Sequence, residues 1–288
     1  MPDGFLLMDK PEGWTSHDVV ARVRRILGMR AVGHAGTLDP FATGLLVLGV
    51  GKATRLLRFI SDQEKTYRGR GVLGIGTTTL DPEGEINHRE PLPTTPADLE
   101  AAMADWVGPI QQIPPMASAI SVNGVRLHRL ARQGIEVERT PRAVHIYEFE
   151  LLGFTGGDFP EFDFRVRCSK GTYIRSLIDD LASDLGGHGH LLSLRRLAIG
   201  PLSVEASVTP TQLEADPEAR LLTPAAGLTG LPMIAVGEDV AEAVANGRML
   251  PLHPEGSAEH FGVLDQRGKL LGVYRHEGSQ AKAEVVLR

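Results

Sequence analysis

The stretch "VGHAGTLDPFATGLL", residues 32–46, decides how the rest of the chain is interpreted. It places one acid, Asp39, among glycines, a proline and small residues, and an aliphatic run follows directly. Pro40 and Gly44 argue against a helix that starts here, since glycine inside a helix is unfavourable. An exposed loop has no need of the apolar wall that follows Asp39. We therefore expect a loop that presents Asp39 inside a cleft.

The composition is typical of a globular protein that folds in a reducing compartment. The chain has 288 residues and a single cysteine, Cys168, which excludes an internal disulfide framework. The first residues lack a basic segment followed by a long apolar one. The longest apolar stretch, "GLLVLGVG", is too short to span a bilayer. We expect a cytoplasmic protein without a membrane partner.

The formal net charge of −6 argues against a nucleic-acid partner, but its distribution does not. Residues 1–70 carry 11 basic against 7 acidic side chains, and residues 121–147 and 165–200 are also basic. If these segments share one face, the protein can bind a polyanion while it stays acidic overall. The alternative is chance clustering of solvated surface charge.

Apolar periodicity and turn residues predict mixed helices and strands. "TSHDVVARVRRILG" predicts a helix that is capped by Thr15 or Ser16 and ends at Gly28. "LLVLGVG" predicts a buried strand. The connector near 207–230 and the short strands after it predict two domains, residues 1–228 and a small C-terminal β-barrel over 229–288.

The usual catalytic and metal-binding motifs are absent from the sequence. It contains no P-loop and no HExxH, and His188 and His190 lack metal-ligand spacing toward the distant Cys168. We therefore expect no metal. Cys168 ends an apolar strand and is interpreted as a buried structural thiol.

Asp39 remains the best candidate for chemistry. A lone carboxylate in an apolar pocket needs a cation to stay ionised, and Arg175 is a candidate at a strand-to-helix junction. Tyr67 and Tyr173 offer flat faces for a ring-shaped substrate. In the alternative interpretation Asp39 caps a turn, Arg175 neutralises Asp179, and both tyrosines pack in the core.

Several segments together resemble the TruB family of pseudouridine synthases. "GHAGTLDPFATGLL" is similar to the signature loop of that family. Further segments agree in the same order: "LLMDKPEGWTSHDVV", "KTYRGRGVLGIGTTTLDPEGE", "IPPMASAISVNGVRLHRLARQGIEVER" and "CSKGTYIRSLIDDLASDLG" with "LRRLAIG". The C-terminal part resembles, more weakly, an RNA-binding barrel of the PUA type. The resemblance implies an α+β fold with a mixed, mostly antiparallel sheet flanked by helices.

The resemblance also implies an activity and a set of site residues. By this resemblance, the protein is expected to isomerise a uridine in the T loop of tRNA, position 55, to pseudouridine without a cofactor or metal. Asp39 is the implied catalyst, and Arg175 pairs with it. The substrate-pocket residues are implied to be Tyr67, which stacks on the flipped uracil, Tyr173, Leu194 and His34, which accompanies extrusion of the base.

With this activity, the basic segments are expected to bind the T stem-loop of tRNA. We expect four arginines to contact phosphates: Arg30, Arg126, Arg129 and Arg132. A monomer is the simplest expectation. Two other hypotheses stay open: a guide-RNA-dependent synthase that acts on rRNA with partner proteins, and a module that binds and refolds tRNA without chemistry.

Overall fold

The computed structural model describes residues 3–287 except 117, 119–120, 123–124, 127–132, 134, 136, 218–219 and 253–257. The chain forms two compact units, each built from segments far apart in the sequence. The first unit contains Met1–Pro40, Gly44–Gln63 and Ala198–Arg288. The second unit contains Phe41–Thr43 and Glu64–Leu197.

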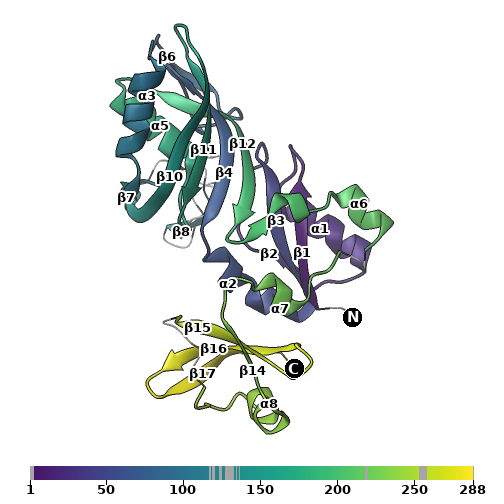
Figure 1. Cartoon of the computed structure of the whole chain (residues 1–288). Helices are drawn as coiled ribbons and strands as arrows, with labels where there is room; N and C mark the ends of the chain where they lie inside the picture. Colours follow the sequence, from purple (N-terminus) through teal and green to yellow (C-terminus); the bar gives the residue numbers. More distant parts are fainter. Residues whose placement is uncertain are drawn as a thin grey trace. The chain divides into compact units, whose positions relative to one another are not determined.

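The first unit is built on three N-terminal strands and one helix (Figure 1). They are β1 (Gly4–Lys10), α1 (Ser16–Leu27), β2 (Val32–His34) and β3 (Thr43–Val50). β3 pairs antiparallel with both β1 and β2. Along β1, Leu6 and Met8 pack in the cluster that contains the apolar side of α1, whereas Phe5 and Leu7 pack in a different cluster. Both faces of this sheet are therefore buried, as the continuous apolar run predicts.

Helix α1 confirms the sequence prediction in detail. The Thr15 side chain accepts a hydrogen bond from the Asp18 backbone N–H, and the Asp18 side chain accepts one from the Thr15 N–H. This reciprocal pair satisfies two backbone donors at the start of the helix. Gly28 ends the helix in the left-handed conformation at φ 61°.

Short helices and strands complete the first unit. They are η1 (Gly51–Leu56), α2 (Leu57–Ser61), β13 (Leu202–Ser203), η2 (Val204–Ala206), α6 (Pro210–Ala215) and α7 (Pro224–Gly227). The C-terminal residues form a four-stranded sheet in the order β14-β15-β16-β17 with one helix. Its elements are β14 (Met233–Ala235), α8 (Glu238–Ala245), β15 (His260–Leu264), β16 (Leu270–Glu277) and β17 (Gln280–Val286). Where the sequence predicts a small β-barrel, the structure describes this four-stranded sheet and its helix.

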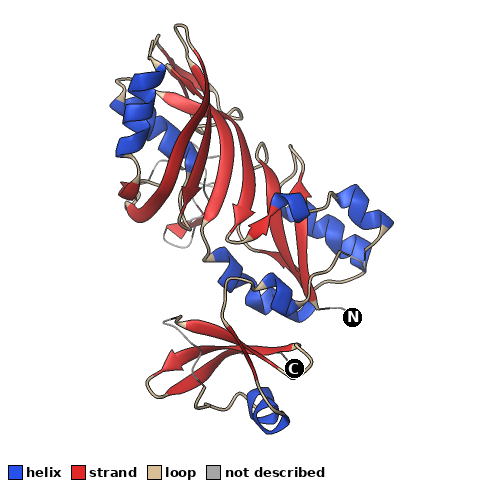
Figure 2. Cartoon of the chain, viewed as in Figure 1, coloured by secondary structure: helices blue, strands red, loops and turns tan. Residues whose placement is uncertain are grey.

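The second unit contains a sheet with the strand order β12-β4-β11-β10-β7. Its strands are β4 (Lys65–Leu73), β7 (Gly108–Gln112), β10 (Arg142–Thr155), β11 (Glu161–Cys168) and β12 (Gly189–Ile199). Helices α3 (Pro96–Asp105) and α5 (Ile174–Asp184) lie together on one side of this sheet (Figure 2). Two hairpins are added: β5 (Ile75–Thr77) with β6 (Ile86–Arg89), and β8 (Ser121–Val122) with β9 (Val125–Arg126).

The observed architecture confirms the expected α+β fold with a mostly antiparallel sheet and flanking helices. The compact units group Ala198–Arg288 with the N-terminal strands. The functional division into residues 1–228 and 229–288 stays a prediction. Within the described ranges, no helix has the length and apolar character needed to cross a bilayer.

Candidate active site

Asp39 lies in the loop between β2 and β3 of the first unit. The antiparallel pairing of these two strands brings the ends of the loop together. The loop turns at Gly36, whose φ of +107° is a conformation that L side chains rarely adopt. Ala35 and Leu38 are buried, whereas Asp39 itself is half-buried. Burial of these small and apolar residues therefore holds the loop in place, while the Asp39 carboxylate stays partly accessible.

The residue after Asp39 is fixed by a buried lysine. Lys10 is fully buried, and its Nζ donates hydrogen bonds to the carbonyl oxygens of Pro11, Trp14 and Pro40 at 3.0, 2.5 and 3.0 Å. The Gly13 N–H also donates to the Pro40 carbonyl, at 2.9 Å. The turn that follows β1 and the Asp39 loop are thus held together. The sequence did not single out Lys10, because its partner Pro40 is 30 positions away.

His34 lies at the end of β2, next to the same loop. Its ring is half-buried and meets the ring of His17 edge-on, with centroids 5.7 Å apart and an interplanar angle of 77°. His17 is exposed in the first turn of α1. His34 and Asp39 belong to the same compact unit, with His34 at the start of the loop that contains Asp39.

The second unit contains the other predicted pocket residues. Tyr67 on β4 and Leu194 on β12 are buried, and Tyr173 is half-buried at the N-terminus of α5. The amide of Gln112, itself 1% exposed, brackets the Tyr173 backbone. Its Oε1 accepts from the Tyr173 N–H at 2.7 Å, and its Nε2 donates to the Tyr173 carbonyl at 3.0 Å. Sequence reasoning missed Gln112, which lies 61 positions from Tyr173.

Arg175 forms a buried ion pair with an acid that sequence reasoning did not select. Its Nη1 lies 3.1 Å from Oδ2 of Asp81, and the two side chains are 5% and 3% exposed. The same Nη1 donates to the Thr79 carbonyl at 2.9 Å. A buried charge is tolerated when it is both paired and hydrogen-bonded, and this arginine meets both conditions.

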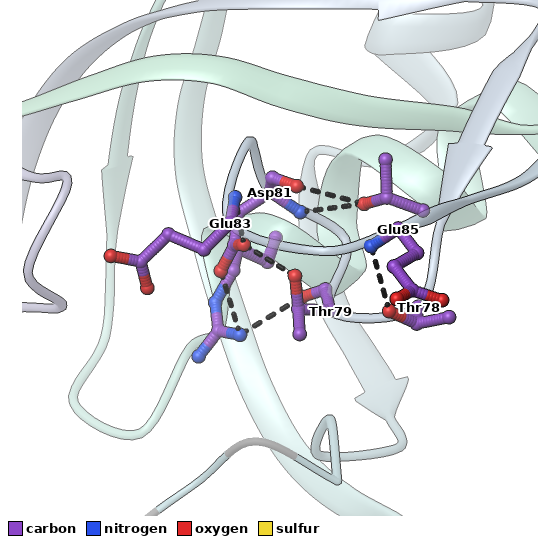
Figure 3. A network of polar contacts seen from close by, with 7 residues as sticks. Thr78, Thr79, Asp81, Glu83 and Glu85 are labelled. Carbon is purple, nitrogen blue, oxygen red and sulfur yellow. Dashed lines mark hydrogen bonds and ion pairs between the residues drawn. The ribbon is translucent and has the colours of Figure 1, made fainter.

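The turn that carries Asp81 is built to hold its carboxylate (Figure 3). Oδ1 of Asp81 accepts a hydrogen bond from the Thr79 hydroxyl and a second from the Glu83 N–H at 3.1 Å. The Asp81 backbone exchanges hydrogen bonds with the Thr77 hydroxyl, which accepts from its N–H and donates to its carbonyl. Leu80 adopts a left-handed φ of 62°, which is costly for a leucine. The surrounding hydrogen bonds compensate this strain and orient Asp81.

In the alternative interpretation of the sequence, Arg175 neutralises Asp179. The structure gives Arg175 a buried ion pair with Asp81, and Oδ1 of Asp179 lies 3.4 Å from Nδ1 of His188. Asp39 and Arg175 belong to different compact units, so their pairing stays a prediction. Asp81 was overlooked because "DPEGE" has the composition of an ordinary exposed turn. The three threonines before it are the signal that could have revealed it.

The expected phosphate-binding arginines are only partly described. Arg30 is exposed in the first unit. Arg126 ends β9, but its side chain lies outside the described residues, as do Arg129 and Arg132 entirely. These four contacts therefore stay predictions.

Cys168 and the acidic and histidine side chains offer no metal site in the part of the chain that the structure describes. No group of three or more His, Cys, Asp or Glu residues there is arranged to hold a metal ion. Burial raises the pKa of the Cys168 thiol to about 11, so this thiol is protonated at neutral pH. It is a packed structural residue, as expected.

Comparison with known proteins defines the class. The model described as "TruB family pseudouridylate synthase (N terminal domain)" matches residues 24–174, and "tRNA Pseudouridine synthase II, C terminal" matches residues 231–288. The α+β fold and these matches define a pseudouridylate synthase, an isomerase. The chain belongs to the TruB family.

Relatives and solved structures agree over nearly the whole chain. "tRNA pseudouridine synthase B" of Thermobifida fusca (strain YX) is 44% identical over 99% of both chains. The protein of the same name from Geobacillus kaustophilus (strain HTA426) is 45% identical over 87% of this chain and 91% of its own. A chain in the crystal structure of a Cbf5-Nop10-Gar1 complex is 25% identical, with a TM-score of 0.76 over 99% of this chain and 84% of its own.

Proposed function

We propose that this protein isomerises uridine 55 in the T loop of tRNA to pseudouridine, with Asp39 as the catalytic residue. The observation that carries the proposal is the 44% identity, over 99% of both chains, to a relative named tRNA pseudouridine synthase B. The site adds chemical support, because Asp39 is a half-buried carboxylate in a loop whose flanking backbone is tightly held.

The reaction changes which atom of uracil is bonded to the sugar. The bond from ribose C1′ to N1 breaks, the base turns, and a bond from C1′ to C5 forms. The hydrogen on C5 is lost and N1 gains one, so no atom is added or removed. Asp39 starts the reaction by attack on C1′ or by removal of the 2′ proton. One carboxylate suffices for either path, and neither step requires a metal.

The substrate must leave the base stack before Asp39 reaches it. Flipping a base costs a few kcal/mol, roughly, and less in a loop than in a duplex. In this proposal His34 accompanies extrusion, Tyr67 stacks on the uracil, and Tyr173 and Leu194 line the pocket. Base–aromatic stacking contributes about 1–3 kcal/mol, which is comparable with the cost of extrusion.

Arg175 has a supporting role in this scheme. Its Nη1 is bound by Asp81 and the Thr79 carbonyl, which fixes the orientation of the planar guanidinium. We propose that the positive charge of this oriented guanidinium keeps Asp39 ionised. The same proposal includes the monomeric state and the cytoplasmic location. It also includes contacts with tRNA phosphates by Arg30, Arg126, Arg129 and Arg132.

The test is product formation in a synthetic T-arm stem-loop RNA, with wild type and Asp39→Asn compared in the absence of metal and guide RNA. Product at the T-loop uridine from wild type alone supports both the reaction and the catalyst. Product from both proteins contradicts the role of Asp39.

A guide-dependent synthase is the second candidate, because the fold of this protein is similar to that of a chain in the Cbf5-Nop10-Gar1 complex, at 25% identity. Turnover of free T-arm RNA without a guide separates the two candidates. Tight RNA binding without product from wild type would favour the guide-dependent hypothesis, or the module that binds and refolds tRNA.

A further inference from the structure

We infer that Ser16 is a positioning residue for Asp39 and that it acts through the backbone of Leu38. The inference rests on the proposed catalytic role of Asp39. Ser16 is the first residue of α1, and it lies 22 positions before Leu38 in the sequence.

A single hydroxyl satisfies both backbone polar groups of Leu38. The Ser16 Oγ accepts a hydrogen bond from the Leu38 N–H at 2.9 Å and donates one to the Leu38 carbonyl at 3.2 Å. Ser16 is 2% exposed and Leu38 is 4% exposed, so water cannot replace these bonds easily. Leu38 lies outside the strands, where no ladder supplies partners for its backbone. Buried backbone groups in such a place need a side chain to bind them.

The hydroxyl of Ser16 is not needed by its own helix. The cap of α1 is formed by Thr15 and Asp18, which bind each other's backbone. A serine in the first helical turn is ordinarily a solvated or capping residue. Here it points into the protein, which assigns it to the Asp39 loop and not to helix stability.

The helix that carries Ser16 is itself firmly anchored. Val19, Val20 and Val23 of α1 are buried in a cluster with residues of β1 and β3. Ser16 therefore transfers the position of a packed helix to the peptide that precedes Asp39. The peptide that follows Asp39 is held at the Pro40 carbonyl by Lys10. Asp39 is thus fixed on both sides while its own side chain stays partly accessible.

We call the two hydrogen bonds between Ser16 Oγ and the Leu38 backbone the clamp. Loss of this clamp should affect the reaction more than RNA binding. A displacement of about 1 Å at a reacting group can cost roughly a hundredfold in rate. Ser16→Ala removes both bonds and leaves two buried polar groups of Leu38 without a partner. We expect kcat on the T-arm RNA to fall roughly tenfold or more, with KM and the RNA dissociation constant unchanged within error.

The matched control is Val23→Ala in the same helix. Val23 is fully buried and is not bonded to the loop, so its truncation lowers the melting temperature without releasing Leu38. We expect Val23→Ala to destabilise the protein at least as much as Ser16→Ala while it retains the wild-type kcat. An equal loss of kcat in both variants would show that Ser16 acts only through stability and would overturn the inference.

Amide hydrogen exchange over residues 35–42 provides a measurement that does not depend on turnover. Ser16→Ala should speed exchange in this peptide, and Val23→Ala should not. Unchanged exchange in Ser16→Ala overturns the clamp even if wild type forms no product. Absence of product from wild type, with faster exchange in Ser16→Ala, would contradict the proposed function but keep the clamp. A wild-type kcat in Ser16→Ala, or a loss confined to KM, overturns its positioning role.

Discussion

Oδ2 of Asp81 lies 3.1 Å from Nη1 of Arg175, and both side chains are almost completely buried. Asp81 follows a hairpin strand, and Arg175 lies in the first turn of a helix 94 positions later in the chain. The pair joins a turn to the first turn of α5. The Thr79 carbonyl and hydroxyl bind the two partners, so the charges are hydrogen-bonded as well as paired.

Asp81→Asn should therefore be strongly destabilising. It breaks an ion pair whose two side chains are 5% and 3% exposed, and breaking a buried ion pair typically costs about 3–5 kcal/mol. We also expect product formation to fall, because Arg175 loses the partner that orients it. Denaturant unfolding and the T-arm assay measure the two effects.

The Arg70–Asp163 pair supplies the control for that prediction. Nε and Nη2 of Arg70 bind the two oxygens of Asp163 at 3.0 Å each, but the pair is solvent-exposed. Exposed ion pairs contribute about 0–1 kcal/mol. Asp163→Asn should thus have a small effect on both measurements, and an equal effect of the two substitutions would contradict the importance of burial.

Gln112→Ala tests whether the Tyr173 backbone needs its two hydrogen bonds from the Gln112 amide. The substitution removes two hydrogen bonds at a position that is 1% exposed, and each buried group left without a partner costs about 1–3 kcal/mol. We expect lower stability and weaker turnover, because Tyr173 lines the proposed uracil pocket. The neighbouring Gln111 is exposed, so Gln111→Ala should resemble wild type in thermal unfolding and product formation.

The sequence predicted those features of the fold that depend on local patterns. Helix α1 follows from its predicted cap at Thr15 or Ser16, of which the structure shows Thr15, and from its terminal glycine, Gly28; β3 follows from its apolar run. These signals lie within a few positions of the residues that they order. Local physics is therefore sufficient to predict them.

The supports of the site could not be predicted in the same way. Lys10, Ser16, Gln112 and Asp81 each bind a partner between 22 and 94 positions away. A lysine at the end of a strand, or an acid in a turn, is ordinarily exposed. Apart from the three threonines before Asp81, the neighbouring residues do not indicate that these side chains are buried, since burial depends on which distant segments pack together.

Gly84→Ala should disturb the turn that carries Asp81. A Cβ at Gly84 would lie 2.4 Å from the Thr79 hydroxyl oxygen and 2.7 Å from the Thr79 nitrogen, so the turn must move. Such overpacking costs about 1–3 kcal/mol, and it should also reduce turnover through Arg175. Gly237 has open space around it, so Gly237→Ala should leave both the melting temperature and the turnover nearly unchanged.

Asp180 on α5 should make stability depend on pH. Burial, and then the nearby charges of Asp179 and Asp184, raise the pKa of Asp180 to about 6 from its ordinary value of 3.8. The folded protein therefore binds the proton more tightly than the unfolded chain, and the stability that this gives is lost as pH rises from about 4 to 6. Asp180→Asn removes this pH-dependent loss of stability. At pH 7 it should therefore raise the free energy of unfolding by on the order of 1 kcal/mol, after allowance for solvent screening.

The measurement for this last prediction is the difference in unfolding free energy between Asp180→Asn and wild type at several pH values. The difference should be small near pH 4, grow up to about pH 6 and then stay constant, because the carboxyl is fully ionised above that range. Asp105→Asn, at an exposed position of α3, should show no such growth. A difference that is flat from pH 4 to 7, or one that falls with pH, would mean that Asp180 ionises without penalty in the folded protein.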